Sequence, residues 1–116
     1  MNKFFRVSEF ACKCGCGFDS IDRELVALIT AVRLHFKEPV TITSGCRCAS
    51  HNKAVGGAVG SKHLEGIAAD IQVKNVAPKA VQAFLNELLP RGRYGIGYGR
   101  SFTHLDTRPN GARFEY

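Results

Sequence analysis

Two histidines and an aspartate give this chain three potential metal ligands, His63, Asp70 and His104, in a sequence with only 4 histidines. Two neutral imidazoles and one carboxylate suit a zinc ion (Zn2+) that keeps its fourth coordination position open for water. A water bound in that position loses a proton near neutral pH, so sites of this kind often perform hydrolysis. The residue types therefore predict a hydrolytic zinc centre.

The local sequence around the three residues indicates how they meet. Residues 67–73 are predicted to form a buried strand that carries Asp70, and His63 lies in the turn before it. Residues 102–107 form another predicted strand, which carries His104. Because the turn brings His63 back toward the strand that carries Asp70, we expect His63 and Asp70 to converge on one point.

Apolar periodicity and turn residues predict the remaining elements. Helices are expected over residues 21–37, 48–55 and 78–89, and strands over 40–43, 67–73, 94–98, 102–107 and 112–116. Asp19 or Ser20 is expected to cap the first helix, and Pro78 suits the first turn of the last one. Asn110-Gly111 predicts a hairpin between the last two strands. The mixture indicates an α+β fold with a small, mainly antiparallel sheet flanked by helices.

Length and composition predict one domain over residues 1–116, acting as a monomer. The net charge of +6 suits anionic partners, but no nucleic-acid-binding module is recognisable, and nucleic acid is not expected as a partner. No apolar run approaches the length of a membrane span. The N-terminus lacks the apolar core of a signal peptide, so synthesis in the cytoplasm is expected.

A longer pattern, S-x-H-x-x-G-x-A-x-D, matches at every fixed position: Ser61, His63, Gly66, Ala68 and Asp70. With the later H-x-D at His104, the chain resembles the zinc D-Ala-D-Ala carboxypeptidases and their phage endolysin relatives. The resemblance extends to Ser8-Glu9-Phe10, Thr43-Ser44-Gly45-Cys46-Arg47-Cys48 and His51-Asn52, and so covers about residues 4–108. It implies a hedgehog/DD-peptidase-like fold, zinc ligands at His63, Asp70 and His104, and cleavage of peptidoglycan stem peptides or crosslinks.

Peptide hydrolysis also needs a general base and an acid for the leaving amine. Many relatives place a Glu, Asp or His two or three residues before the third ligand, but here Phe102 and Ser101 occupy those places. Asp106 and Glu65 are the remaining candidates. Asp106 shares a strand face with His104, so it is predicted either to act as the base or to orient that ligand imidazole. Glu65 occupies a free position of the motif and is the weaker candidate.

Two further residues are candidates for substrate binding. The resembled family has a substrate-facing arginine in an S-G-x-R segment, which corresponds to Arg47. A guanidinium pairs well with a substrate carboxylate, or stabilises a developing oxyanion, which makes Arg47 a catalytic candidate as well. Ser61 either hydrogen-bonds substrate or caps the turn before His63, and the capping role is favoured.

The five cysteines, Cys12, Cys14, Cys16, Cys46 and Cys48, are an odd number, which argues against a complete disulfide framework. A cytosolic chain keeps them reduced. Three interpretations remain open: plain thiols near the site, a second structural metal, or one or two disulfides formed after release from the cell. The first is slightly favoured.

The function predicted from these features is a zinc-dependent peptidase that hydrolyses amide bonds in bacterial peptidoglycan. We expect it to act at the cell wall after phage- or holin-type release, or within a phage particle. The alternative is a non-catalytic, metal-containing wall-binding module of a phage or prophage particle, which the lack of an upstream base keeps open. The motif is compatible with carboxypeptidase and endopeptidase activities alike.

Overall fold

The computed structural model describes residues 1–116 and consists of a five-stranded sheet with helices. The sheet has the strand order β1-β2-β4-β3-β5. The strands are β1 (Val40–Ser44), β2 (Ala68–Val73), β3 (Gly95–Tyr98), β4 (Thr103–Asp106) and β5 (Ala112–Glu115). The α-helices are α1 (Arg23–Phe36), α2 (Ala49–Ala54) and α3 (Pro78–Leu88), and the 3-10 helices are η1 (Val7–Phe10) and η2 (Lys62–Glu65). The predicted α+β class is confirmed.

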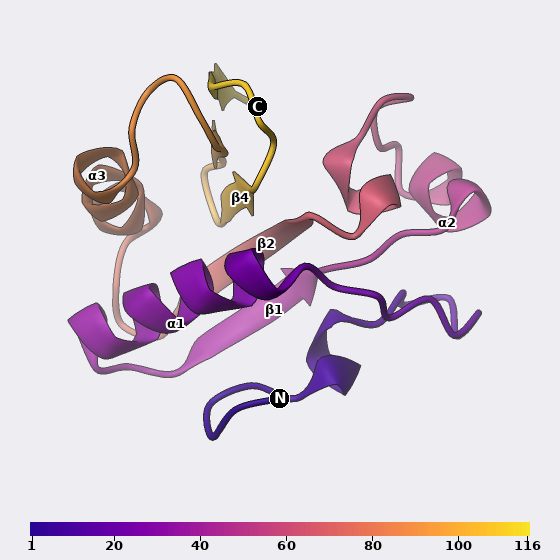
Figure 1. The fold of residues 1–116 in the computed structure, drawn as a ribbon, viewed down its shortest axis with the longest axis horizontal. Helices are drawn as coiled ribbons and strands as arrows, with labels where there is room; N and C mark the ends of the chain where they lie inside the picture. The colour runs from indigo at the N-terminus through magenta and orange to yellow at the C-terminus, as the bar shows by residue number, and fades with distance from the viewer.

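The long helices cover one face of the sheet. α1 packs over β2, and α3 packs over β3 and against α1 (Figure 1). Apolar side chains fill the space between these helices and the sheet, among them Leu25, Ile29, Val32, Val81, Leu85, Ile71, Ile96 and Leu105. Burying each such side chain contributes on the order of 1.5–3 kcal/mol, so this layer holds the sheet in place.

The start of α1 differs from the prediction. Asp22 is the N-cap, and its side chain accepts a hydrogen bond from the Leu25 N–H at 3.2 Å. Neither Asp19 nor Ser20, the predicted caps, has this role, so that prediction is wrong. The reason is that Asp22 directly precedes the first helical residue, where a carboxylate reaches the free amides of the first turn. The predicted helix start at Pro78 is confirmed, because Pro78 is the first residue of α3.

Strand alternation separates the core from the chemistry-bearing residues. In β2, Ala69 and Ile71 belong to the hydrophobic core, so Asp70 projects from the opposite face. In β4, Leu105 belongs to the core, so His104 and Asp106 also project from the opposite face. The predicted site residues therefore lie on the sheet face that α1 and α3 leave free.

The last strand pairs differently from the predicted hairpin. β5 runs parallel to β3, with Ile96 beside Arg113, and it does not pair with β4. The hairpin predicted at Asn110-Gly111 is therefore wrong. β4 is already paired antiparallel with β2 on one side and with β3 on the other, so neither of its edges is free for β5.

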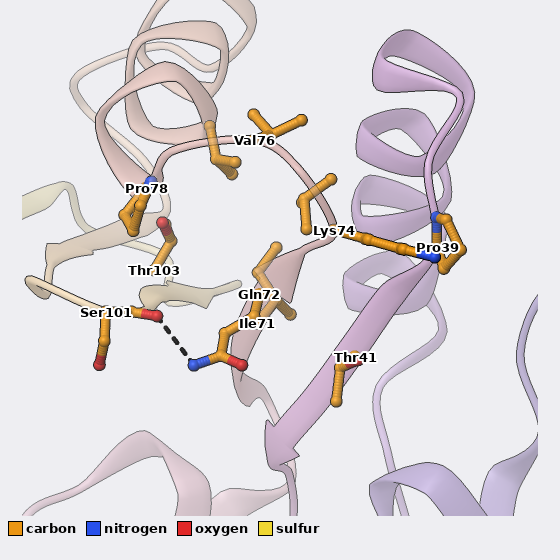
Figure 2. A pocket seen from close by; sticks show the side chains of 11 residues that line it. Pro39, Thr41, Ile71, Gln72, Lys74, Val76, Pro78, Ser101 and Thr103 are labelled. Atoms are coloured by element: carbon orange, nitrogen blue, oxygen red, sulfur yellow. Dashed lines mark hydrogen bonds between the residues drawn. The ribbon is translucent and has the colours of Figure 1, made fainter.

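One pocket lies away from the predicted site, at the end of the β1–β2 pair near the start of α3 (Figure 2). Beside it, the Gln72 side-chain amide donates a hydrogen bond to the Ser101 carbonyl at 2.9 Å. Its lining includes Lys74 and Thr103 but no histidine, cysteine or carboxylate, so it offers none of the usual zinc ligands. No helix is both long and apolar enough to cross a membrane.

Candidate metal centre

The three predicted ligands come together in the structure. Asp70 and His104 are direct partners across the β2–β4 pair, and Asp70 Oδ1 lies 3.1 Å from His104 Nδ1. His63 reaches the same carboxylate from η2, with its Nε2 atom 3.3 Å from Asp70 Oδ1. All three residues are nearly enclosed, with exposed fractions of 2%, 7% and 4% for His63, Asp70 and His104.

The turn that carries His63 fixes the orientation of its ring. The Ser61 hydroxyl accepts a hydrogen bond from the His63 N–H at 3.3 Å, which caps η2. Gly66 ends η2 with a left-handed φ of 72°. The His63 Nδ1 atom lies 2.7 Å from the Gly45 carbonyl oxygen, so Nδ1 carries the proton and donates. Nε2 is then left with a lone pair directed into the site.

That lone pair has no hydrogen-bond partner, and His63 Nε2 is the only buried side-chain polar atom in the protein of which this is true. Its close neighbour, Asp70 Oδ1, is also an acceptor, so the two atoms cannot form a hydrogen bond while His63 is neutral. An uncompensated pair of buried acceptors is costly unless a cation lies between them.

His104 contributes a third lone pair in the same way. Its Nε2 atom lies 2.7 Å from Asp106 Oδ2, the closer of its two carboxylate neighbours, so the proton of the neutral ring belongs on Nε2. Nδ1 then faces Asp70. Burial lowers the pKa of His104, but hydrogen bonds to Asp106 and Asp70 outweigh burial and raise it. The surroundings of His104 therefore attract positive charge.

Asp70 completes the set as an ionised group. Burial raises the pKa of its carboxyl, but the neighbouring His104 and His63 rings outweigh burial and bring the pKa down to about 2. Two imidazole nitrogens and one carboxylate oxygen thus lie within 4.8 Å of one another. This donor set, with its partnerless nitrogen, fits a zinc ion with three protein ligands.

Asp106 lies beneath His104 and is fully enclosed, with an exposed fraction of 0%. Arg108 holds it from the other side: its Nε donates to Oδ1 at 2.8 Å, and its terminal nitrogen donates to Oδ2 at 2.6 Å. Burial raises the pKa of Asp106, but the Arg108 and His104 contacts outweigh burial and hold it well below its usual range. The sequence placed Asp106 on the His104 face, but nothing in it singled out Arg108.

Arg47 reaches the site from the segment after β1. One terminal nitrogen lies 3.3 Å from Asp70 Oδ2, and its Nε donates to the Ser44 hydroxyl at 3.0 Å. The other terminal nitrogen donates to Asn52 Oδ1 at 3.2 Å. Asn52 is buried and also donates to the Ala58 carbonyl at 2.9 Å. No role of its own was predicted for Asn52, because its contact with Arg47 forms only when α2 is folded.

These residues lie in a cleft on the open face of the sheet. Arg47, Ser61, His63, Asp70 and His104 all line it. Phe114 and Tyr116 close one side, with the Phe114 ring 5.3 Å from the His104 ring. Neither candidate base lines the cleft. Asp106 lies behind His104, and the Glu65 side chain is about half exposed and pairs with Lys62 at 3.2 Å.

An α+β sheet that holds a buried His–Asp–His group at a cleft is an arrangement suited to metallopeptidases. Residues 3–106 match the family model Peptidase M15. The chain therefore belongs to the M15 family, the D-Ala-D-Ala carboxypeptidase family, and has the hedgehog/DD-peptidase fold that this family implies. A comparison with curated proteins gave no match.

Proposed function

We propose that this protein is a zinc-dependent peptidase that hydrolyses amide bonds in the peptides of bacterial peptidoglycan. The observation that carries the proposal is the partnerless His63 Nε2 atom, which faces the Asp70 carboxylate and the His104 ring in a cleft. Membership of the M15 family supports peptidoglycan peptides as the substrate class. With such a substrate, the place of action is the bacterial cell wall.

His63 Nε2, Asp70 Oδ1 and His104 Nδ1 would hold the zinc ion. When bound, zinc would supply an activated water and polarise the scissile carbonyl. The surrounding residues keep both ligand imidazoles in the tautomer that can bind a metal. The Gly45 carbonyl fixes the proton of His63 on Nδ1, and Asp106 fixes the proton of His104 on Nε2.

Arg47 is the substrate-binding residue in this proposal. Its side chain lines the cleft, and contacts with Ser44 and Asn52 hold the guanidinium in one orientation. A guanidinium held in this way is suited to pair with a carboxylate of a stem peptide or with an oxyanion that develops at the scissile carbonyl. Ser61 also lines the cleft, but its hydroxyl accepts the His63 amide, which favours capping over substrate binding.

Asp106 is assigned as a positioning residue for His104. Its carboxylate is enclosed and contacts His104 and Arg108, so a substrate in the cleft would not reach it. The competing proposal, a wall-binding module without catalysis, rests on the same geometry. Neither Asp106 nor Glu65 lines the cleft to serve as a general base.

The test is hydrolysis of purified peptidoglycan, with mass analysis of the released fragments. The protein is assayed as purified, after chelation, and after zinc is restored. The matched variant is His63→Ala, which lacks one of the three proposed zinc ligands. Zinc-dependent release of peptides is expected, and the new termini identify the bond that is cut. A zinc-loaded protein that binds peptidoglycan but releases nothing would overturn the peptidase proposal and establish the binding module.

A further inference from the structure

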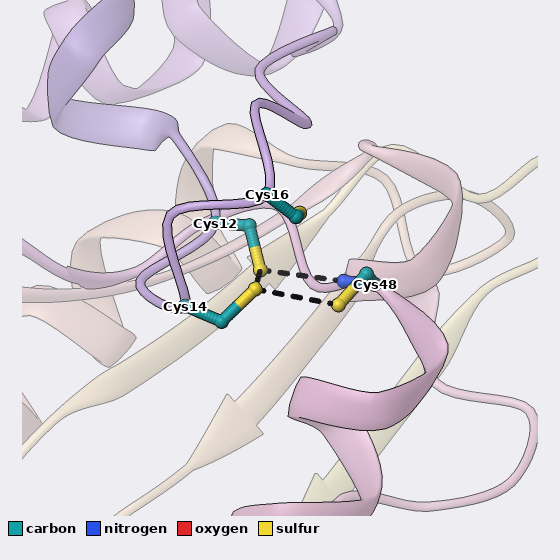
Figure 3. A group of neighbouring side chains, drawn as sticks. All are labelled: Cys12, Cys14, Cys16 and Cys48. Carbon is teal, nitrogen blue, oxygen red and sulfur yellow. Dashed lines mark hydrogen bonds between the residues drawn. The ribbon is translucent and has the colours of Figure 1, made fainter.

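Four of the five cysteines form a second cluster, which shares no residue with the His–Asp–His group. Cys12, Cys14 and Cys16 come from the loop after η1, and Cys48 is the N-cap of α2 (Figure 3). The Cys12 and Cys14 sulfurs lie 3.4 Å apart, and the Cys14 and Cys48 sulfurs lie 3.5 Å apart. The four sulfurs all lie within 4.8 Å of one another.

The backbone of the loop is shaped to bring its three sulfurs together. The Cys12 N–H donates to the Phe18 carbonyl at 2.8 Å, and the Gly15 N–H donates to the Cys12 carbonyl at 3.2 Å. Gly15 and Gly17 have left-handed φ values of 82° and 93°, which glycine adopts without strain. Without these turns, the Cα atoms of Cys12 and Cys16 in an extended chain would lie about 13 Å apart, too far for both thiolates to bind one ion.

Backbone amides point at two of the sulfurs. The Cys48 N–H donates to Cys12 Sγ at 3.4 Å, and the His51 N–H donates to Cys48 Sγ at 3.4 Å. Hydrogen bonds of this kind orient and stabilise thiolate ligands. The cluster therefore has four sulfur donors and backbone amides that hydrogen-bond to two of them.

From this geometry we propose a second metal site, in which Cys12, Cys14, Cys16 and Cys48 bind one Zn2+ ion for a structural purpose. A tetrahedral zinc ion with Zn–S distances of about 2.3 Å places its sulfurs about 3.8 Å apart, close to the observed spacings. A complete set of four protein ligands leaves no position for water, so this site supports structure rather than catalysis.

The ion would join two distant parts of the chain next to the proposed active site. It links the loop at residues 12–16 to Cys48, which directly follows Arg47 in the sequence. Arg47 itself contacts Asp70. The second site therefore fixes the segment that presents the proposed substrate-binding arginine, although its existence does not depend on peptidase activity.

The first test is the zinc content of protein purified under reducing conditions. Two zinc ions per chain are expected, falling to one in Cys16→Ser and to one in His63→Ala, because each change removes a ligand of a different site. Cys46→Ala is the matched control. Cys46 is a buried thiol outside the cluster, so its removal should leave both ions in place.

A spectrum of the unaltered protein keeps the test decisive if the variants do not fold. Cobalt(II) added to the metal-free, reduced protein should give an intense sulfur-to-cobalt charge-transfer band, which His63→Ala retains. One zinc ion per chain and no such band would overturn the proposal. So would a mass spectrum of the native protein that shows disulfides among Cys12, Cys14, Cys16 and Cys48 in place of zinc.

Discussion

His104 Nε2 lies 2.7 Å from Asp106 Oδ2, a carboxylate two residues further along the same strand. Since residues at this spacing share a strand face, β4 supplies both the proposed ligand and the group that orients it. Arg108 then holds Asp106 through two side-chain hydrogen bonds, so three alternate residues form one connected row.

Replacing Asp106 with Asn should weaken zinc binding at the active site. The amide cannot hold the proton of His104 on Nε2 as the carboxylate does, and the loss of such an outer partner typically costs about 10–100-fold in metal affinity. The measurement is the free zinc concentration that restores half of the peptidoglycan hydrolysis in a chelator-buffered series.

The same variant separates positioning from acid–base catalysis. If hydrolysis stays absent at saturating zinc while the zinc affinity, measured by direct binding titration, is unchanged, Asp106 transfers the proton itself and the positioning role is wrong. Glu65→Gln is the matched control, because Glu65 lies outside the cleft and pairs with Lys62. This change should alter neither zinc affinity nor turnover.

Replacing Arg47 with Lys should raise KM about 10- to 100-fold, with a smaller effect on kcat. Lysine keeps the charge but loses the forked geometry, and a hydrogen bond to a charged group contributes about 1.5–3 kcal/mol. Steady-state kinetics on a soluble stem peptide measure the two constants. A raised zinc requirement with an unchanged KM would instead show that Arg47 serves mainly to hold Asp70.

The convergence of His63 and Asp70 could be predicted from sequence, because a turn directly precedes the strand that carries Asp70. The arrival of His104 was implied only by the family resemblance, because β2 and β4 pair across an intervening helix and strand. The roles of Asn52 and Arg108 could not be predicted in this way. Both contacts are short in sequence but depend on side-chain direction, which the sequence pattern did not indicate: Asn52 reaches Arg47 from within α2, and Arg108 follows the end of β4.

The position of β5 shows the limit of a local turn signal. Asn110-Gly111 favours a hairpin, but the edges of β4 are occupied by β2 and β3, so the chain crosses to the free edge of β3. This crossing brings Phe114 close to the His104 ring and places Tyr116 along the cleft. Neither aromatic residue could be assigned to the cleft from its own surroundings in the sequence.

Replacing Gly95 with Ala should displace Asp106 and thereby disturb the His104 ligand that Asp106 orients. Gly95 pairs with Asp106 across β3 and β4, and a Cβ atom there would lie 2.2 Å from Asp106 Oδ2. The fixed neighbour makes this an overpacked position, with an expected cost of about 1–3 kcal/mol in the free energy of unfolding. Urea unfolding measures that cost, and the chelator-buffered assay should show weaker zinc binding. Gly92→Ala, where nothing lies within 4 Å of the added atom, should change neither quantity.

Replacing Asp22 with Ala should lower the free energy of unfolding by about 1–2 kcal/mol without changing the zinc requirement. The change removes the cap of α1 and leaves the Leu25 amide without its side-chain partner. It also removes the acceptor of the Thr107 hydroxyl, which lies 2.7 Å from Asp22 Oδ2 and joins the helix start to the end of β4. Urea unfolding followed by circular dichroism gives the value. Ser20→Ala is the control, and an equal loss in that variant would contradict the assignment of Asp22 as the cap.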